Sequence, residues 1–390
     1  LPGVPYTLSH RINPSLREYR RAISTVIDAS LKPIMGAYMR GLEDRLRAAG
    51  FSGRVLVITS QGGVMDAQDA ADAPVNLINS GPSMAPVAAQ AYVAEGKADT
   101  LIVGDTGGTT FDVSLVRKGR IPRTRETWLG QPFRSHMTGM PSVDVKSIGA
   151  GGGSIAYVDK GGLLHVGPIS AGAMPGPVCY GRGGTRPTVT DAALVLGFID
   201  PEFFLGGKMS LDRAGSLAAI RKEVAEPLGM SIESAAEAIM ALATEHMVQA
   251  IMDITVHQGI DPAEAIFVAG GGAAGLNCVA IGRRLKCRSV VVTEAAAALV
   301  GRGAGGGERG LRAADAGAAP VGGGAVGVGG AVLVAAVLDG RLELALLAVL
   351  AGALVLDGDA EVAAGRAVAV LVAGLGVPVR AVHEDRVGVA

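Results

Sequence analysis

The stretch from Thr100 to Gly119, TLIVGDTGGTTFDVSLVRKG, contains the residue types that a phosphate group needs. Gly107 and Gly108 let backbone N–H groups approach an anion closely, because they carry no side chain. The hydroxyl groups of Thr109 and Thr110 follow directly and can donate hydrogen bonds to phosphate oxygens. The run therefore has the donors of a phosphate cradle.

Two carboxylates flank this run: Asp105 ends the first apolar stretch, and Asp112 begins the second. A carboxylate beside a phosphate can hold a hydrated Mg²⁺ ion. A plain hairpin explains the same residues, since residues 101–103 and 113–116 are strand-like and a Gly-Gly pair is a common two-residue turn. In that case Asp112 serves only as a hydrogen-bond acceptor that stabilises the hairpin.

A second glycine run, Gly270, Gly271 and Gly272, connects a predicted strand at 265–268 to a predicted helix that begins near Ala274. Such a turn offers bare backbone and a helix N-terminus to a ligand. Two interpretations of Gly271 stay open. If a nucleotide approaches it, Gly271→Val should weaken ATP binding and leave the fold nearly intact; if it needs a positive φ, the same change should cost stability.

The first 293 residues alternate between helical and strand patterns, which predicts an α/β protein. The expected elements are helices at 16–49, 83–94 and 231–258 and from 274 onward, strands at 55–58, 101–103, 113–116, 265–268 and 289–292, and short strands within 147–167. Pro33 is expected to kink or split the first helix. A glycine hairpin followed by a long helix and a strand-glycine-helix unit is the order of the second half of an actin-like ATPase domain.

Longer motifs carry a family resemblance. GDTGGTTFDVSLV resembles the second phosphate loop of the actin-like superfamily, and VAGGGAAGLN resembles its adenosine motif. VDVKSIGAGGGSIAYVD, GPISAGAMPGPVCYGRGGTRPTVTDAALVLG and FLGGKMSLD resemble the hydantoinase A / 5-oxoprolinase family, which includes subunits of acetone and acetophenone carboxylases. The resemblance covers roughly residues 1–298. It implies an α/β, actin-like (ribonuclease H-like) ATPase fold that is incomplete here, because the family has an upstream domain with another Asp-Gly-Gly-Thr loop.

The resemblance also implies ATP and Mg²⁺ as cofactors and gives roles to individual residues. The implied site comprises Asp105 for Mg²⁺ or its water shell and for catalysis, Asp144 for catalysis, Gly107, Gly108, Thr109, Thr110 and Asp112 for the phosphates, and Gly270, Gly271 and Gly272 for the adenosine. The family commonly has a His two residues after the position that resembles Asp144, where this sequence has Lys146, so the resemblance supplies no His ligand for a metal at that position. Asp191 matches the family as well, but an N-cap before Ala192 explains it equally well.

The activity that the resemblance implies is ATP-dependent opening of cyclic amides of the hydantoin or 5-oxoproline type, through phosphoryl activation of a carbonyl oxygen. The alternatives are an ATP-hydrolysing subunit of a carboxylase that uses a ketone substrate, or an inactive nucleotide-binding remnant. A second large subunit of the hydantoinase B type is the expected partner, in a cytoplasmic hetero-oligomer. The net charge of −1 gives no indication of nucleic acid or of an anionic membrane surface.

The C-terminal quarter has an unusual composition. From Glu294 to Ala390 only Ala, Gly, Val, Leu, Arg, Asp, Glu, Pro and His occur, and all of these have codons that begin with G or C. A frameshift in a GC-rich gene would produce this alphabet, so the chain after about Leu299 is expected to be a frameshifted tail. Its apolar stretches at 321–338 and 344–356 are attributed to composition and not to membrane spans. The expected parts are residues 1–97, the remainder of a truncated first actin-like domain with its linker helix; 98–298, the second actin-like domain; and 299–390, the tail.

Overall fold

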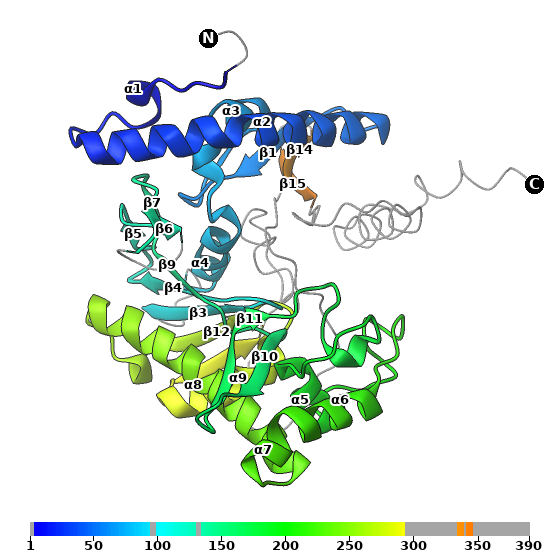
Figure 1. The fold of residues 1–390 in the computed structure, drawn as a ribbon. Helices are drawn as coiled ribbons and strands as arrows, with labels where there is room; N and C mark the ends of the chain where they lie inside the picture. Colours follow the sequence, from blue (N-terminus) through cyan, green and yellow to red (C-terminus); the bar gives the residue numbers. More distant parts are fainter. Residues whose placement is uncertain (1–3, 94–98, 130–133, 293–333, 339–340, 346–390) are drawn as a thin grey trace, which may run out of the picture. The chain divides into compact units, whose positions relative to one another are not determined.

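The computed structural model describes residues 4–93, 99–129, 134–292, 334–338 and 341–345 (Figure 1). The expected frameshifted tail therefore lies outside the described residues, apart from the backbone of two short strands. The described chain forms two compact units. One unit contains residues up to Gly81, the segment Arg123–Ser142 and those two strands, and the other contains Pro82–Pro122 and the described residues from Val143 onward. The boundary expected near residue 97 from the sequence thus differs from this division.

The first unit is built on one long helix and a small antiparallel sheet of order β15-β14-β1-β2. Its elements are α1 (Ser9–Ile12), α2 (Glu18–Ala48), β1 (Arg54–Ile58), β2 (Val64–Asp66), α3 (Ala67–Asp72), η1 (Pro74–Leu77), β5 (Arg123–Thr124), β6 (Trp128–Leu129), β7 (His136–Met137), β14 (Val334–Leu338) and β15 (Arg341–Ala345). The predicted first helix is confirmed, and Pro33 lies inside it without splitting it. Buried Met39 and Leu42 of α2 pack against Val55 and Val57 of β1.

The second unit contains a five-stranded mixed sheet of order β13-β12-β3-β4-β9. Its strands are β3 (Thr100–Thr106), β4 (Phe111–Arg117), β9 (Val145–Ile148), β12 (Ile266–Gly270) and β13 (Ser289–Val292). β12 runs parallel to both β3 and β13, whereas β4 is antiparallel to β3 and to β9. The strands predicted at 101–103, 113–116, 265–268 and 289–292 are all present, and their ends lie within three residues of the expected bounds.

Helices cover both faces of this sheet because successive side chains of a strand point to opposite faces. Ile102 of β3 faces α8 (Ile232–Gln258) and α9 (Ala274–Leu285), while Leu101 and Val103 face α4 (Ser80–Val93). Figure 1 shows α4 on one side of the sheet and α8 and α9 on the other. Each face thus has its own apolar core.

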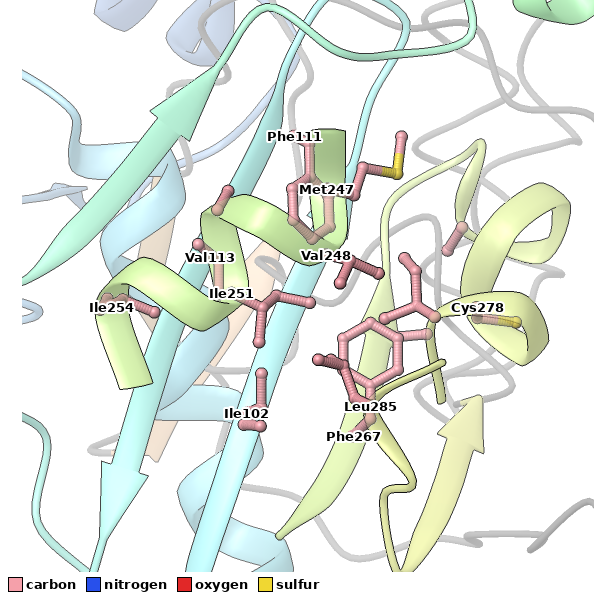
Figure 2. Packing of buried hydrophobic residues seen from close by; sticks show 14 of the residues in the cluster. Ile102, Phe111, Val113, Met247, Val248, Ile251, Ile254, Phe267, Cys278 and Leu285 are labelled. Carbon is pink, nitrogen blue, oxygen red and sulfur yellow. The ribbon is translucent and has the colours of Figure 1, made fainter. Parts of the chain in front are cut away.

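Figure 2 shows the core under α8 and α9. Met247 and Ile251 of α8 pack against Phe111 of β4 and Phe267 of β12, and all four side chains are at most 1% exposed. Cys278 of α9 is buried in the same cluster. Burying a side chain of this size contributes about 1.5–3 kcal/mol, so this core fixes the strands whose ends carry the site.

The N-terminal half of α8 belongs to a second core in the same unit. The remaining elements of this unit are β10 (Ser154–Val158), β11 (Leu164–Ser170), η2 (Val178–Tyr180), α5 (Val189–Val195), α6 (Arg213–Ile220), the π-helical turn η3 (Arg221–Ala225), α7 (Glu226–Leu228) and η4 (Pro262–Glu264), and β8 (Ser142–Val143) lies at the boundary of the units. α8 is long and apolar enough to cross a membrane by length and composition. Its apolar side chains are accounted for by the two cores that it helps to form.

α5 begins differently from the expectation based on Asp191. The N-cap is Thr188, whose hydroxyl accepts from the Asp191 N–H, while the Asp191 side chain accepts from the Thr188 N–H. This reciprocal pair is a capping box, which satisfies two helix N-terminal donors at once. The interpretation of Asp191 as an N-cap before Ala192 was therefore wrong: the cap lies three residues earlier, at Thr188, and Asp191 is the third helical residue.

The start of α8 gives a first testable prediction. The Ser231 hydroxyl accepts from the Ser234 N–H at 3.1 Å, which satisfies one of the free donors of the helix. Ser231→Ala should lower the free energy of unfolding by about 1 kcal/mol, as measured by urea denaturation. Ser231→Asp keeps an acceptor at the cap and should stay close to the unsubstituted protein. Equal losses in both variants would show that the cap contributes nothing.

Candidate functional site

The two glycine-rich motifs of the sequence meet at one edge of the sheet. β3 and β12 are parallel neighbours, and Gly270 lies beside Asp105 in their register. The turn that follows β12 is tied to β3 by a hydrogen bond of 2.9 Å from the Ala273 N–H to the Thr106 carbonyl. The carboxyl ends of parallel strands in α/β sheets are where ligands bind. The hairpin loop at residues 107–110, here called the phosphate loop, and the turn at residues 270–273, here called the glycine turn, are thus one structural site.

Gly271 is required by the fold itself. Its φ is +88°, and a Cβ placed there would lie 2.6 Å from the carbonyl carbon of Thr106 and closer still to Thr106 O and to Asp105 Oδ1. Of the two interpretations of Gly271, the positive φ and the close contacts support the one in which glycine is needed by the backbone, so Gly271→Val is expected to cost stability. A side chain at this position would push the glycine turn away from β3, so the close approach that Gly271 permits is first of all to Asp105 and Thr106.

The phosphate loop presents unpaired N–H groups on one side. Its ends are joined by a hydrogen bond of 2.9 Å from the Gly107 N–H to the Thr110 carbonyl. In the part of the chain that the structure describes, the N–H groups of Gly108, Thr109 and Thr110 donate to no acceptor. Consecutive free backbone donors of this kind form a concave anion-binding site.

A second loop, residues 149–154 and here called the glycine loop, packs backbone to backbone on the phosphate loop. Gly152 N–H donates to Gly107 O at 3.0 Å, and Gly153 N–H donates to Gly108 O at 2.6 Å. A Cβ at Gly151 would lie 2.7 Å from Gly107 O, which is too close for any side chain. Gly151 and Gly153 are therefore needed so that the two backbones can touch.

The two threonines of the phosphate loop have different surroundings. Thr109 is exposed, and its hydroxyl lies 3.2 Å from the hydroxyl of Ser170 on β11. Thr110 is partly buried, and its hydroxyl donates to Asp112 Oδ2 at 3.2 Å. The Thr109 hydroxyl is therefore available to a ligand, while the Thr110 side chain is used by the neighbouring carboxylate.

Asp105 and Asp112 form a carboxylate pair directly opposite each other in the β3–β4 register. Both belong to the strand face that α4 covers, because they alternate with the residues that face α8. Ser147 of β9 is the next residue across the sheet from Asp112. The pair thus sits at the base of the phosphate loop.

Burial, and then the charge of Asp112, raise the pKa of Asp105 to about 7. Burial also raises the pKa of Asp112, whereas hydrogen bonds with the hydroxyls of Ser147 and Thr110 lower it. Two ionised carboxylates this close repel each other, so a cation between them and a phosphate would relieve the repulsion. Mg²⁺ takes one or two carboxylates together with waters and phosphate oxygens, and these residues fit that role. Groups of three or more His, Cys, Asp or Glu that could form a metal cage do not occur among the described residues.

The glycine turn leads into a helix N-terminus that has no side-chain cap. α9 has Ala273 at its N-cap position, which leaves the positive end of the helix dipole unneutralised. A small cavity of about 30 Å³ lies between the three loops, lined in part by Thr109, Gly153, Thr190 and Ala273. The loops that the sequence associates with phosphate and adenosine therefore share one hollow.

Asp144 is not brought to this hollow. It precedes β9 by one residue, and Ser147, which pairs with Asp112, is three residues further on, or roughly 10 Å along a strand. Its carboxylate accepts from the Gln258 side chain at 3.1 Å, on the α8 face of the sheet, and burial raises its pKa. The catalytic role of Asp144 thus stays a prediction that depends on the family resemblance alone.

Lys146 lies on that same α8 face and forms an ion pair with Asp253. This pair lines a separate groove of about 340 Å³ between β9, β11 and α8. Two histidines have hydrogen-bond partners near this groove: His165 lies 2.7 Å from Asp159, and His257 bonds the Asp253 carbonyl within α8.

Three residues of the site were not singled out in the sequence. Ser147 and Ser170 contribute hydroxyls beside Asp112 and Thr109, and Thr190 holds the glycine loop. All three lie inside the long family motifs, which was the only signal available for them. Neither spacing nor periodicity could have indicated which loop they contact, because each contact joins distant parts of the chain.

The mixed sheet, the phosphate loop and the glycine turn at its edge define an α/β domain of the actin-like ATPase class. The chain belongs to the hydantoinase/oxoprolinase family, whose model matches residues 21–308 and ends near the change in composition. It is 38% identical over 299 residues to caprolactamase subunit alpha of Pseudomonas jessenii, an alignment that covers 77% of this chain and 42% of that subunit.

Other relatives agree with this assignment. The chain is 39% identical over 272 residues to the acetophenone carboxylase gamma subunit of Aromatoleum aromaticum, covering 69% of this chain and 36% of the relative. The crystal structure of the ATP-dependent caprolactamase from Pseudomonas jessenii superposes with a TM-score of 0.66 at 38% identity, over 76% of this chain and 42% of that one. The chain spans less than half the length of these relatives.

Proposed function

We propose that this chain binds ATP with Mg²⁺ at the phosphate loop and supports the ATP-dependent opening of a cyclic amide. The observation that carries the proposal is the row of free N–H groups at Gly108, Thr109 and Thr110, placed beside the carboxylates of Asp105 and Asp112. Such donors stabilise the charge that develops on a transferred phosphoryl group. The relatives named caprolactamase and ATP-dependent caprolactamase support the substrate class.

In the proposed reaction, ATP supplies a phosphoryl group to the amide oxygen, ADP leaves, and the activated carbonyl carbon becomes open to attack by water. The ring C–N bond then breaks, and phosphate is released. The residues of this chain bind and orient the nucleotide: Asp105 holds Mg²⁺ or its water shell, Thr109 donates to a phosphate oxygen, and the glycine turn lies against the adenosine. Asp112 neutralises part of the cation's charge beside Asp105.

The proposed enzyme is a cytoplasmic hetero-oligomer with a second large subunit of the hydantoinase B type. Relatives whose names describe them as an alpha or gamma subunit support an assembly of several chains. The partner would contribute the groups that bind the ring or activate water.

A carboxylase subunit is the second candidate function. It is supported by the 39% identity to the acetophenone carboxylase gamma subunit, which is as high as the identity to the caprolactamase subunit. Here the phosphoryl group would go to a ketone enolate or to bicarbonate, and the same phosphate loop would serve.

One assay separates these functions. The complete enzyme, with its partner subunit, is given ATP and Mg²⁺ with caprolactam, 5-oxoproline or hydantoin, or with acetone or acetophenone plus bicarbonate, and ADP release and organic product are measured. We expect ADP release and ring opening with at least one cyclic amide. Release with a ketone and bicarbonate only would support the carboxylase, and nucleotide binding without turnover on any of these substrates would contradict both.

A further inference from the structure

The phosphate-facing donors share peptide units with acceptors on the opposite side of the phosphate loop. In a trans peptide the C=O of one residue and the N–H of the next point in opposite directions. The carbonyl of Gly107 and the N–H of Gly108 belong to one such unit, and the carbonyl of Gly108 and the N–H of Thr109 belong to the next. Whatever holds these two carbonyl groups therefore also sets the direction of the two N–H groups.

The carbonyl of Gly108 is held through Thr190. The N–H and the hydroxyl of Thr190 both donate to the carbonyl of Gly152, each at 2.8 Å. The other side of that peptide unit is the Gly153 N–H, which donates to Gly108 O at 2.6 Å. The order Thr190, peptide 152–153, peptide 108–109 is a relay of hydrogen bonds that ends on the free Thr109 N–H.

A parallel relay ends on Gly108. Ser154 N–H donates to the Gly151 carbonyl at 3.0 Å, and the N–H on the other side of that unit, from Gly152, donates to Gly107 O at 3.0 Å. The Ser154 hydroxyl accepts from the Gly151 N–H at 2.8 Å, which fixes the turn. Hydrogen bonds in a chain polarise one another, so each relay should strengthen its final donor as well as orient it.

Thr190 is itself held in place by a buried carboxylate. Asp191 accepts hydrogen bonds from the N–H groups of Val178, Cys179 and Thr188 and from the hydroxyls of Thr188 and Ser216. Thr190 and Asp191 are 7% and 0% exposed. The first turn of α5 is thus fixed on one side by Asp191 and presents Thr190 to the glycine loop on the other.

We propose that Thr190 is a positioning residue for phosphate binding: through Gly152 and Gly153 it orients the backbone N–H of Thr109 toward the nucleotide. The proposal rests on the proposed ATP binding, and it gives a role to the family motif TVTDAALVLG that lies outside the phosphate and adenosine motifs.

The test compares Thr190→Val with Thr190→Ser in the complete enzyme. Valine has nearly the same shape but loses the hydroxyl donor, whereas serine keeps it. Thr255→Val is the matched control, because Thr255 is also buried in this unit but its hydroxyl bonds only carbonyls of its own helix. Affinity for ATP with Mg²⁺ is measured by calorimetry, and the free protein, labelled with ¹⁵N-threonine and ¹⁵N-glycine, is examined by NMR.

We expect Thr190→Val to weaken ATP binding about threefold to tenfold and to shift the Thr109 amide signal in the absence of ligand. Thr190→Ser should restore both, and Thr255→Val should change neither. If Thr190→Val shifts no phosphate-loop amide and binds ATP normally, the positioning role is wrong. If the unsubstituted enzyme binds no ATP but the amide shift occurs, the relay stands and the proposed nucleotide function fails.

Discussion

Gly271→Ala is expected to lower the free energy of unfolding by at least about 3 kcal/mol and to abolish ATP binding. Two costs combine at this position. A φ of +88° disfavours any side chain by about 1–2 kcal/mol, and the new Cβ overlaps Thr106 and the Asp105 carboxylate. The overlap is with backbone atoms of a central strand, which cannot move away without breaking the register between β3 and β12. Urea denaturation and calorimetry with ATP measure the two effects.

Gly259→Ala isolates the first of these costs. Gly259 ends α8 with a φ of +64°, and a Cβ there would meet no atom within 4 Å. That variant should lose only about 1 kcal/mol and should bind ATP normally. Equal losses of stability in the two variants would show that the crowding at Gly271 has no energetic weight, and the coupling of the glycine turn to Asp105 would have to be abandoned.

The sheet strands and the longer helices of the second unit were predictable from the sequence because their signals are local, whereas the helical elements between Val189 and Leu228 were not predicted. The helix at 231–258 has a serine cap, an apolar stripe and a terminal glycine, and the structure places α8 at Ile232–Gln258. The strands beside the glycines are short apolar runs, and they occur in the expected order. Patterns of this kind can be recognised within one segment, without knowing which distant residues it contacts.

The assembly of the site was not predictable, since it depends on contacts between distant loops. The glycines at 151 and 153 suggested short strands and turns. In the structure, glycine is needed at these positions because the backbone of the phosphate loop, more than 40 residues earlier, leaves no room for a side chain. Gly271 likewise gave no local sign that its neighbour would be Asp105. A glycine in a sequence indicates that space is lacking, but it does not indicate what occupies that space.

Asp144 shows how strand alternation limits a motif-based assignment. The motif VDVKSIGAGGGS places Asp144 and the glycine loop within ten residues, which suggested a common site. In the structure the side chains of β9 alternate, so Ser147 lies beside Asp112 on one face while Lys146 contacts Asp253 on the other. Asp144 contacts Gln258 on the α8 face as well. Residues that are close in sequence along this strand therefore lie on opposite faces of the sheet.

Asp105→Asn is expected to stabilise the protein at pH 8 and at the same time to abolish productive ATP turnover. Burial and Asp112 raise the pKa of Asp105 from its ordinary 3.8 to about 7, so the folded state binds more protons than the unfolded state between these values. The contribution of Asp105 to stability should therefore be greatest below about pH 4 and should fall as pH rises toward 7, by on the order of 2–4 kcal/mol. Asparagine stays neutral, so the variant should lose the part of the fall that Asp105 causes, as measured by urea denaturation from pH 4 to pH 8.

Activity should move in the opposite direction, because the charge that destabilises the fold is the charge that would hold Mg²⁺ beside the phosphates. Asp105→Asn should lower kcat for ATP turnover by at least about a hundredfold. The Asp105 carboxylate would then lower stability and support activity at the same time. In the unsubstituted enzyme, Mg²⁺ with ATP should restore stability at pH 8, and in the variant it should not. Asp112→Asn serves as the control for the coupling: it removes the second cause of the raised pKa of Asp105, so the fall that Asp105 causes should end at a lower pH and be smaller, but should persist. Two results would contradict the assignment of this carboxylate as a buried, cation-dependent charge. One is full turnover in the Asp105→Asn variant. The other is a pH dependence of stability between pH 4 and pH 7 that is the same in the variant and in the unsubstituted protein.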